Sequence, residues 1–241
     1  MKPNIAIIFA GGAGKRMNAK SMPKQFLELH GKPILIYTLE EFQRNKSIDG
    51  IIIVMLSSHI DYTRSLVEKY KISKVADIVA GGETCQESIF KGIKRTHELY
   101  PENSTVLIHD GVRPLVDQNT IDNCIECVRI HGNAITVSPA TETITRKGES
   151  GTIEEIIERS ACQLAKAPQC FGLGDIYRAH LKSQADGLRD FIDSASLMKH
   201  YGVELYTVTG TPENIKITTP GDFYIFRAIV DAKENSQIWG L

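Results

Sequence analysis

Short apolar runs alternate with amphipathic stretches along most of this chain, and this alternation limits the fold more than any other feature. Runs typical of buried strands occupy residues 4–9, 50–55, 76–79, 105–108 and 134–137. Stretches with helical spacing occupy residues 33–42, 62–70, 83–99 and 120–130. Strands that alternate with helices predict an α/β fold, in which helices cover both faces of a mostly parallel, twisted sheet.

The pattern changes between residues 141 and 163, where polar and β-branched residues alternate around Gly148 and Gly151. This region predicts a β-hairpin arm that stands off the main sheet. After the arm, we expect helices near 174–183 and 193–201 and strands near 204–207 and 214–217. A last helix should begin at Pro220, with Thr219 as its N-cap. We therefore expect one domain over residues 1–241, with residues 141–163 as an arm used for dimerisation.

Composition narrows the classes of partner. The chain has 241 residues and a net charge of -1, from 28 basic and 29 acidic side chains. Nucleic-acid and membrane-surface proteins usually carry a basic excess, so we expect neither partner. The first apolar run is too short for a signal peptide or a membrane span, and the five cysteines show no framework spacing. These features predict a cytoplasmic protein with reduced thiols. We expect it to bind a charged ligand through a local cluster of charged side chains.

Three residues, Cys124, Cys127 and His131, suggest a metal site at first sight. Cys124 and Cys127 fall on or near the apolar stripe of a predicted helix, and Gly132 follows as its stop signal. No second ligand pair follows at zinc-site spacing. We therefore interpret the two cysteines as core residues and His131 as part of the last helical turn.

A glycine-rich segment, Ala10-Gly11-Gly12-Ala13-Gly14-Lys15-Arg16, follows the first predicted strand directly. Loops at the carboxyl ends of parallel strands bind ligands, and glycines let backbone N–H groups approach phosphate oxygens. The segment matches neither of two common phosphate motifs. Met17 stands where a dinucleotide-binding motif needs its third glycine, and Arg16 where a P-loop needs Ser or Thr. An ordinary glycine-rich turn is the alternative interpretation.

The segment Pro23-Lys24-Gln25-Phe26 is the second candidate. Proline limits the backbone just before a cation, and Phe26 can anchor the segment in the core. Lys24 alone would be interpreted as a surface lysine. Next to the glycine-rich segment, it indicates a site for a polyanion.

The order of several short motifs resembles the cytidylyltransferases of methylerythritol phosphate and of ribitol phosphate, over nearly the whole chain. The matching motifs are the two segments above with Arg16-Met17, Gly81-Gly82 with Ser88, His109 to Pro114, Pro168-Gln169 with Phe171, Asp193 to Ser196, and Asn214 to Thr218. Thr143 and Arg159 fall where the arm of this family contacts the acceptor. The resemblance implies a Rossmann-like nucleotidyltransferase fold with a projecting arm, and a homodimer in which the arm reaches the neighbouring subunit.

The resemblance also implies an activity: CMP passes from CTP to a sugar-alcohol phosphate, and pyrophosphate leaves. Arg16, Lys24 and Lys216 would be the catalytic cations. The implied nucleotide-binding residues are Ala10, Gly11, Gly12, Gly14, Gly82, Ser88 and Asp110. The implied acceptor-binding residues are Arg113, Thr143, Arg159 and Asp193. Asp110 would also hold Mg²⁺, the expected cofactor, although an aspartate after a strand can simply cap a turn. His109 beside it is more often structural than a proton carrier.

Three positions depart from the usual family pattern. Cys85 stands where family members usually have arginine, and Ala167 stands where they usually have threonine. Lys199 lies near a position that is often glutamate. Ala167 and Lys199, together with the segments Phe26 to Leu29 and Gly31 to Ile34, favour ribitol 5-phosphate as the acceptor. The alternative is 2-C-methyl-D-erythritol 4-phosphate, because Ile192 to Ser196 is closer to the methylerythritol form. Two other interpretations stay open. One is a nucleotidyltransferase that uses UTP, GTP or dTTP, and the other is a nucleotide-binding protein without catalysis.

Overall fold

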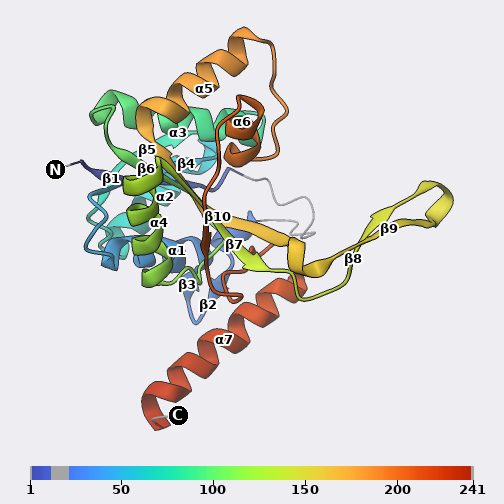
Figure 1. Ribbon diagram of the computed structural model, residues 1–241. Coiled ribbons are helices and arrows are strands. Elements are labelled where there is room, and N and C mark those ends of the chain that lie inside the picture. Colours follow the sequence, from blue (N-terminus) through green and yellow to red (C-terminus); the bar gives the residue numbers. More distant parts are fainter. Residues whose placement is uncertain (1, 12–21, 240–241) are drawn as a thin grey trace.

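The computed structural model of the chain describes residues 2–11 and 22–239 (Figure 1). Its main sheet has seven strands in the order β11-β7-β10-β6-β1-β4-β5. Their bounds are β1 Asn4–Phe9, β4 Gly50–Met55, β5 Val75–Ala80, β6 Thr105–Asp110, β7 Asn133–Pro139, β10 Gln163–Gly172 and β11 Thr207–Thr209. Strands β6, β1, β4 and β5 run parallel, and β11 runs parallel to β7, whereas β10 is antiparallel to both β6 and β7. The predicted α/β fold with a mostly parallel sheet is therefore confirmed.

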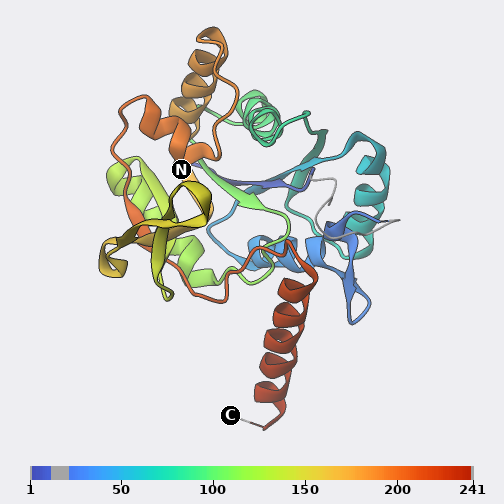
Figure 2. The ribbon, with the colours of Figure 1, turned by 90° about the vertical axis from the view of Figure 1, so that its right-hand side faces the viewer.

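Seven α-helices flank and extend this sheet in the described part of the chain. They are α1 Ile34–Arg44, α2 Ile60–Lys69, α3 Cys85–Leu99, α4 Gln118–His131, α5 Leu173–Ala185, α6 Ser194–His200 and α7 Pro220–Trp239. Alternate residues of β1 show how the sheet is covered. Ala6 and Ile8 pack in one buried cluster with α1, α2 and α4, and Ile7 packs in another with α3, α5 and α6. Figure 2 shows α3 and α5 on one side of the sheet and α1 and α4 on the other.

Local signals explain several helix ends. Thr84 caps α3 by accepting a hydrogen bond from the N–H of Glu87, and Asp117 caps α4 in the same way. Gly132 ends α4 with a φ of 85°, a left-handed conformation that favours glycine. At α7, Thr219 accepts a hydrogen bond from the N–H of Asp222, so the predicted N-cap is confirmed. The first half of α7 packs on its own apolar cluster, and the helix projects from the body (Figure 1).

Two small hairpins complete the fold. Strands β2 Glu28–Leu29 and β3 Lys32–Pro33 pair before α1. Strands β8 Ile144–Lys147 and β9 Ile153–Ile157 pair with each other inside the predicted arm, which extends away from the sheet (Figure 1). In the described part of the chain, no helix is both long and apolar enough to cross a membrane.

The structure corrects two expected strands and adds a third. Residues 214–217 are not a strand, because Asn214 and Lys216 use their side chains to contact other segments and only the N–H of Ile217 bonds a neighbouring chain segment. The strand expected at 204–207 lies at Thr207–Thr209. Strand β10 was missed in sequence analysis, because Lys166 and Pro168 interrupt its apolar alternation.

Candidate active site

Four parallel strands end at one edge of the sheet, and the candidate residues follow them. Beyond β1, the N–H of Ala10 donates to the carbonyl of Val54 on β4 at 2.8 Å. Beyond β5, the N–H of Gly81 donates to the carbonyl of Met55 at 2.7 Å. Asp110 closes β6 beside them. Ligand loops of α/β proteins gather at this carboxyl edge. Gly12, Gly14 and Arg16 lie outside the described residues.

The Lys24 segment is fixed against the end of β1. Lys24–Phe26 forms a single 3-10 turn, and the buried Gln25 donates from Nε2 to the carbonyl of Ala10 at 2.6 Å. Phe26 stacks on His59 with ring centroids 5.4 Å apart and meets Tyr62 edge-on at 5.0 Å. The turn therefore carries Lys24 at the same sheet edge as Ala10 and Gly11, as the sequence predicts.

Ser88 brings the predicted glycines together. Its Oγ accepts a hydrogen bond from the N–H of Gly82 at 3.0 Å and donates to the carbonyl of Thr84 at 2.9 Å. A Cβ on Gly81 would lie 2.9 Å from that Oγ, and one on Gly11 would lie 3.6 Å from it, so a side chain at position 81 would collide with the serine. A hollow of about 530 Å³ opens beside Gly81 and Gly82. Ser88 thus shapes the backbone here and is itself buried.

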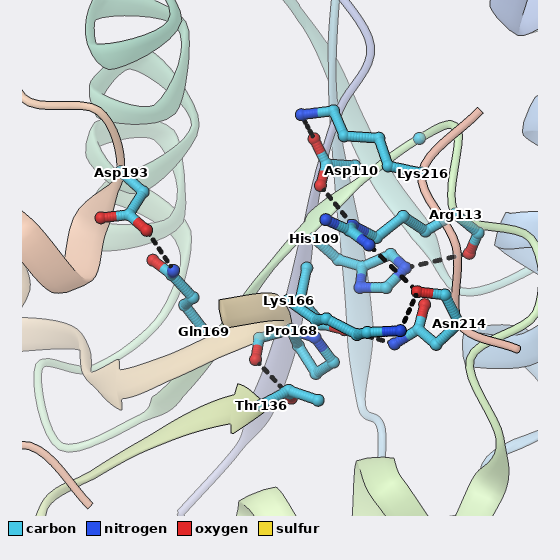
Figure 3. Close-up of polar contacts among 12 residues, drawn as sticks. His109, Asp110, Arg113, Thr136, Lys166, Pro168, Gln169, Asp193, Asn214 and Lys216 are labelled. Carbon is cyan, nitrogen blue, oxygen red and sulfur yellow. Dashed lines mark hydrogen bonds and ion pairs between the residues drawn. The ribbon is translucent and has the colours of Figure 1, made fainter. Parts of the chain in front are cut away.

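Asp110 is buried and is the centre of an ion cluster (Figure 3). Its Oδ1 lies 2.5 Å from Nζ of Lys216, and its Oδ2 lies 2.7 Å from Nε of Arg113. Arg113 also donates to the carbonyl of Asn214 at 3.0 Å. Burial opposes ionisation of Asp110, but Lys216 and Arg113 outweigh it and hold the pKa of the carboxyl below its ordinary value. The arrangement keeps a carboxylate and two cations at the sheet edge.

Asp193 lies across the same cavity from β6. It caps α6 by accepting from the N–H of Ser196 at 2.8 Å, and its other oxygen accepts from Nε2 of Gln169 at 2.7 Å. The cavity measures about 170 Å³. Its lining includes Asp110, Arg113, Asp193 and Lys216 with two positions that depart from the family pattern, Cys85 and Ala167. Lys199 is exposed on α6 and does not line the cavity.

His109 is fully buried behind the cluster. Its Nε2 lies 3.1 Å from the carbonyl of Arg113, and its ring meets Phe42 edge-on at 5.0 Å. Burial lowers its pKa to about 4, so the ring is neutral at pH 7. Its contacts favour the structural interpretation given above.

The arm residues lie apart from this cavity. Arg159 donates from a terminal nitrogen to the carbonyl of Thr141 at 3.1 Å, and it lines a hollow of about 800 Å³ at the base of the arm. Thr143 is exposed just before β8. Within one chain, neither residue lines the cavity of Asp110 and Arg113. The structure thus brings Asp110, Arg113, Asp193 and Lys216 together and leaves the two arm residues outside.

Two polar residues of this cavity, Lys166 and Gln169, were not among the candidates predicted from the sequence. Both line the cavity from β10, the strand that was not predicted. The only signal for Gln169 was its place in the Pro168-Gln169 motif, and Lys166 had none. The three residues first considered for metal binding have separate surroundings: Cys124 is in the core, Cys127 donates weakly to the carbonyl of Asn133, and His131 stacks on Tyr206.

The Asp110 carboxylate fits the prediction of a magnesium site. Mg²⁺ commonly takes one or two protein carboxylates and fills its other positions with substrate phosphates and water. Asp110 is ionised and lines the cavity, although both of its oxygens are also paired with cations.

Comparison with known proteins shows which sequences and structures this chain resembles. The family described as IspD, 2-C-methyl-D-erythritol 4-phosphate cytidylyltransferase, matches residues 4–232. A ribitol-5-phosphate cytidylyltransferase of Vibrio parahaemolyticus is 49% identical over 98% of this chain and 100% of its own length. A 2-C-methyl-D-erythritol 4-phosphate cytidylyltransferase of Clostridium acetobutylicum is 39% identical over 97% of this chain and 99% of its own. Among solved structures, the 4-diphosphocytidyl-2C-methyl-D-erythritol synthase of Anaerococcus prevotii superposes with a TM-score of 0.82, at 29% identity, over 95% of this chain and 96% of its own.

Proposed function

The chain belongs to the IspD family of cytidylyltransferases, and we propose that it transfers CMP from CTP to ribitol 5-phosphate with release of pyrophosphate. The observation that supports this role best is the Asp110, Arg113 and Lys216 cluster at the end of β6. Such a cluster can position phosphate groups and stabilise the charge that develops on them.

The acceptor already carries a phosphate, which is a competent nucleophile at neutral pH. The enzyme therefore needs no strong general base, and catalysis consists of positioning and electrostatic stabilisation. In the proposed roles, Lys24 and Arg16 bind the triphosphate and neutralise the departing pyrophosphate. Lys216 contacts the α-phosphate, where charge develops during attack. Bound Mg²⁺, with Asp110 as its protein ligand, would neutralise phosphate oxygens.

We assign nucleotide recognition to the segment around Gly82 and Ser88. The close packing of Gly81 against Ser88 leaves backbone groups at the wall of the adjoining hollow. Hydrogen bonds from such groups can select cytosine, and a narrow fit excludes the larger purines. Gly11, Gly12 and Gly14 would meet the phosphates through their backbone N–H groups. The N–H of Ala10 bonds the carbonyl of Val54, so Ala10 would fix the start of this nucleotide-binding segment.

The acceptor phosphate is assigned to Arg113, Thr143 and Arg159, and its hydroxyls to Asp193. Because Thr143 and Arg159 lie outside the cavity of their own chain, we propose that they act on the site of a second subunit in a homodimer. Cytoplasmic placement stays a prediction, which the five unpaired cysteines support.

Ribitol 5-phosphate is favoured over 2-C-methyl-D-erythritol 4-phosphate for two reasons. Identity is 49% to the ribitol-5-phosphate relative and 39% to the methylerythritol relative. Ala167 lines the cavity without the hydroxyl that family members usually place there. A site that lacks one hydrogen-bonding group discriminates strongly between acceptors that need it and acceptors that do not.

The test is kcat/KM for both acceptors at saturating CTP and Mg²⁺. We expect ribitol 5-phosphate to lead by about tenfold or more. A clear preference for methylerythritol phosphate would reject this acceptor and leave cytidylyl transfer intact. A parallel panel with UTP, GTP and dTTP tests the nucleotide, and pyrophosphate release in either assay removes the non-catalytic alternative.

A further inference from the structure

Lys166 is a cation on the wall of the Asp110 cavity (Figure 3). It lies in β10 where the pairing with β7 shifts register between Ala165 and Gln169. Strand alternation is broken there, so a bulge can aim a side chain away from the regular sheet pattern. Lys166 thereby lines the same cavity as Arg113 and Lys216.

The contacts of Lys166 differ from those of the other two cations. Its Nζ donates to the carbonyls of Pro212 at 2.9 Å, Asn214 at 3.4 Å and Thr211 at 3.5 Å. All three acceptors are neutral, and two of the distances are at the long end of the hydrogen-bond range. Arg113 and Lys216, in contrast, each contact the Asp110 carboxylate.

Among the described residues that line the cavity, no carboxylate forms an ion pair with Lys166. The two carboxylates of the cavity are Asp110, which Arg113 and Lys216 share, and Asp193, which accepts from Gln169 and the start of α6. Burial lowers the pKa of Lys166 and Arg113 lowers it further, while Glu213 opposes them. An ammonium that is less stable here than in water gains from the arrival of an anion.

We propose that Lys166 binds the phosphate group of the acceptor from within the subunit that holds the nucleotide. This inference rests on the proposed function. Arg113, first assigned to that phosphate, is held by Asp110 and by the carbonyl of Asn214, and only 12% of its side chain is exposed. Lys166 adjoins Ala167, where the hydroxyl of the usual threonine is lost. The acceptor phosphate is then held from two sides, by Lys166 of one subunit and by the arm of the other.

A purely structural role makes a different prediction. The bonds from Lys166 brace residues 211–214, the segment that leads to Lys216. If bracing were the whole role, loss of the amine would displace Lys216 and lower kcat. It would also weaken CTP binding and lower the thermal stability of the protein.

The experiment compares Lys166→Met with Lys166→Arg and with the control Lys46→Met, which removes an exposed cation at the amino end of β4, the opposite edge of the sheet. For Lys166→Met, we expect the KM of the acceptor to rise about tenfold or more, with the KM of CTP changed by less than about twofold. Lys166→Arg keeps the charge and should restore the acceptor KM to within about threefold of the original. The control should leave both constants unchanged.

The inference would be overturned if Lys166→Met lowered kcat and raised the KM of CTP but left the KM of the acceptor unchanged. A second experiment distinguishes failure of this inference from failure of the proposed function. It is calorimetric titration of inorganic phosphate into enzyme saturated with CMP. If no polyol phosphate is turned over, the proposed function fails, yet weaker phosphate binding by Lys166→Met would still support the inference. Equal phosphate binding by the original protein and Lys166→Met would reject it even where turnover is as proposed.

Discussion

The sheet-edge site and the arm are built in opposite ways. At the sheet edge, Asp110 is only 5% exposed, and both of its ion-pair partners, Arg113 and Lys216, come from the same chain. In the arm, β8 and β9 pair only with each other, and Ile153 and Ile156 are 62% and 69% exposed. A lone two-stranded hairpin is marginally stable in water. The ion cluster of the first region forms within one chain, whereas the second region presents exposed apolar side chains that a partner subunit could cover.

Loss of one sheet-edge cation should have the largest effect. Lys216→Met removes the group placed at the α-phosphate and leaves Asp110 with Arg113 alone. We expect kcat to fall by about 10²–10³, since one donor to developing charge typically has an effect of this size. Steady-state pyrophosphate release measures it. Lys24→Ala should lower kcat by a similar factor if Lys24 binds the triphosphate.

The matched control for that prediction is Lys147→Met, the same substitution on an exposed arm lysine. It should leave kcat within about twofold of the original, because an isolated surface charge contributes little. Comparable losses at both positions would remove the distinction between the two regions. Retention of most activity by Lys216→Met would show that the Asp110 cluster is not the reaction centre.

An intermediate effect is expected from the arm. Arg159→Ala should reduce kcat/KM by about tenfold to a hundredfold, mainly through the acceptor KM, because it removes a charged contact to a phosphate. If Arg159 acts across a dimer, mixing inactive Lys24→Ala subunits with Arg159→Ala subunits creates one intact site in each mixed dimer. Random exchange should then restore about a quarter of the original activity.

Sedimentation at micromolar concentration accompanies the mixing experiment. The expected species is a dimer, and only monomer would contradict the role of the arm. Activity that stays absent after subunit exchange, in protein that is dimeric, would place Arg159 in its own subunit. That outcome would make the two regions parts of one intramolecular site.

The sequence predicted the parallel half of the molecule best. Apolar runs such as residues 50–55, which form β4 with the same bounds, bury every side chain and so carry an unambiguous pattern. Strand β10 was missed because it is polar at its exposed end, contains Pro168, and breaks register at Lys166. Residues 214–217 have the β-branched composition of a strand, but the Asn214 side chain bonds the carbonyl of Ala167 and Lys216 reaches Asp110.

The residues of the candidate site also divide into those that the sequence predicts and those that it does not. Asp110, Arg113 and Lys216 could be predicted because each lies in a motif that resembles the family. That Arg113 pairs with Asp110 and with the carbonyl of Asn214 depends on side-chain geometry that no local pattern encodes. Lys166 belongs to no motif, and its place beside the cavity follows from an irregularity in strand pairing.

The smallest effect should be on stability as a function of pH, and it should be confined to the body of the protein. His109 and His180 are buried, and burial lowers the pKa of each to about 4, from an ordinary value of 6.5. The unfolded chain therefore binds more protons than the folded one, and stability falls as pH drops from about 6.5 toward 4. Each histidine should contribute a loss of about 1–2 kcal/mol in the free energy of unfolding between pH 7 and pH 5. His180→Phe keeps a ring that can stack on Phe90 and should remove about half of this pH dependence in urea unfolding, with the exposed His200→Asn as the control. Residues 141–163 contain no histidine, so the same acidification should leave association through the arm nearly unchanged. If His180→Phe retained the full pH dependence, or if dimers dissociated before the body lost stability, the pH response could not be assigned to these two buried rings.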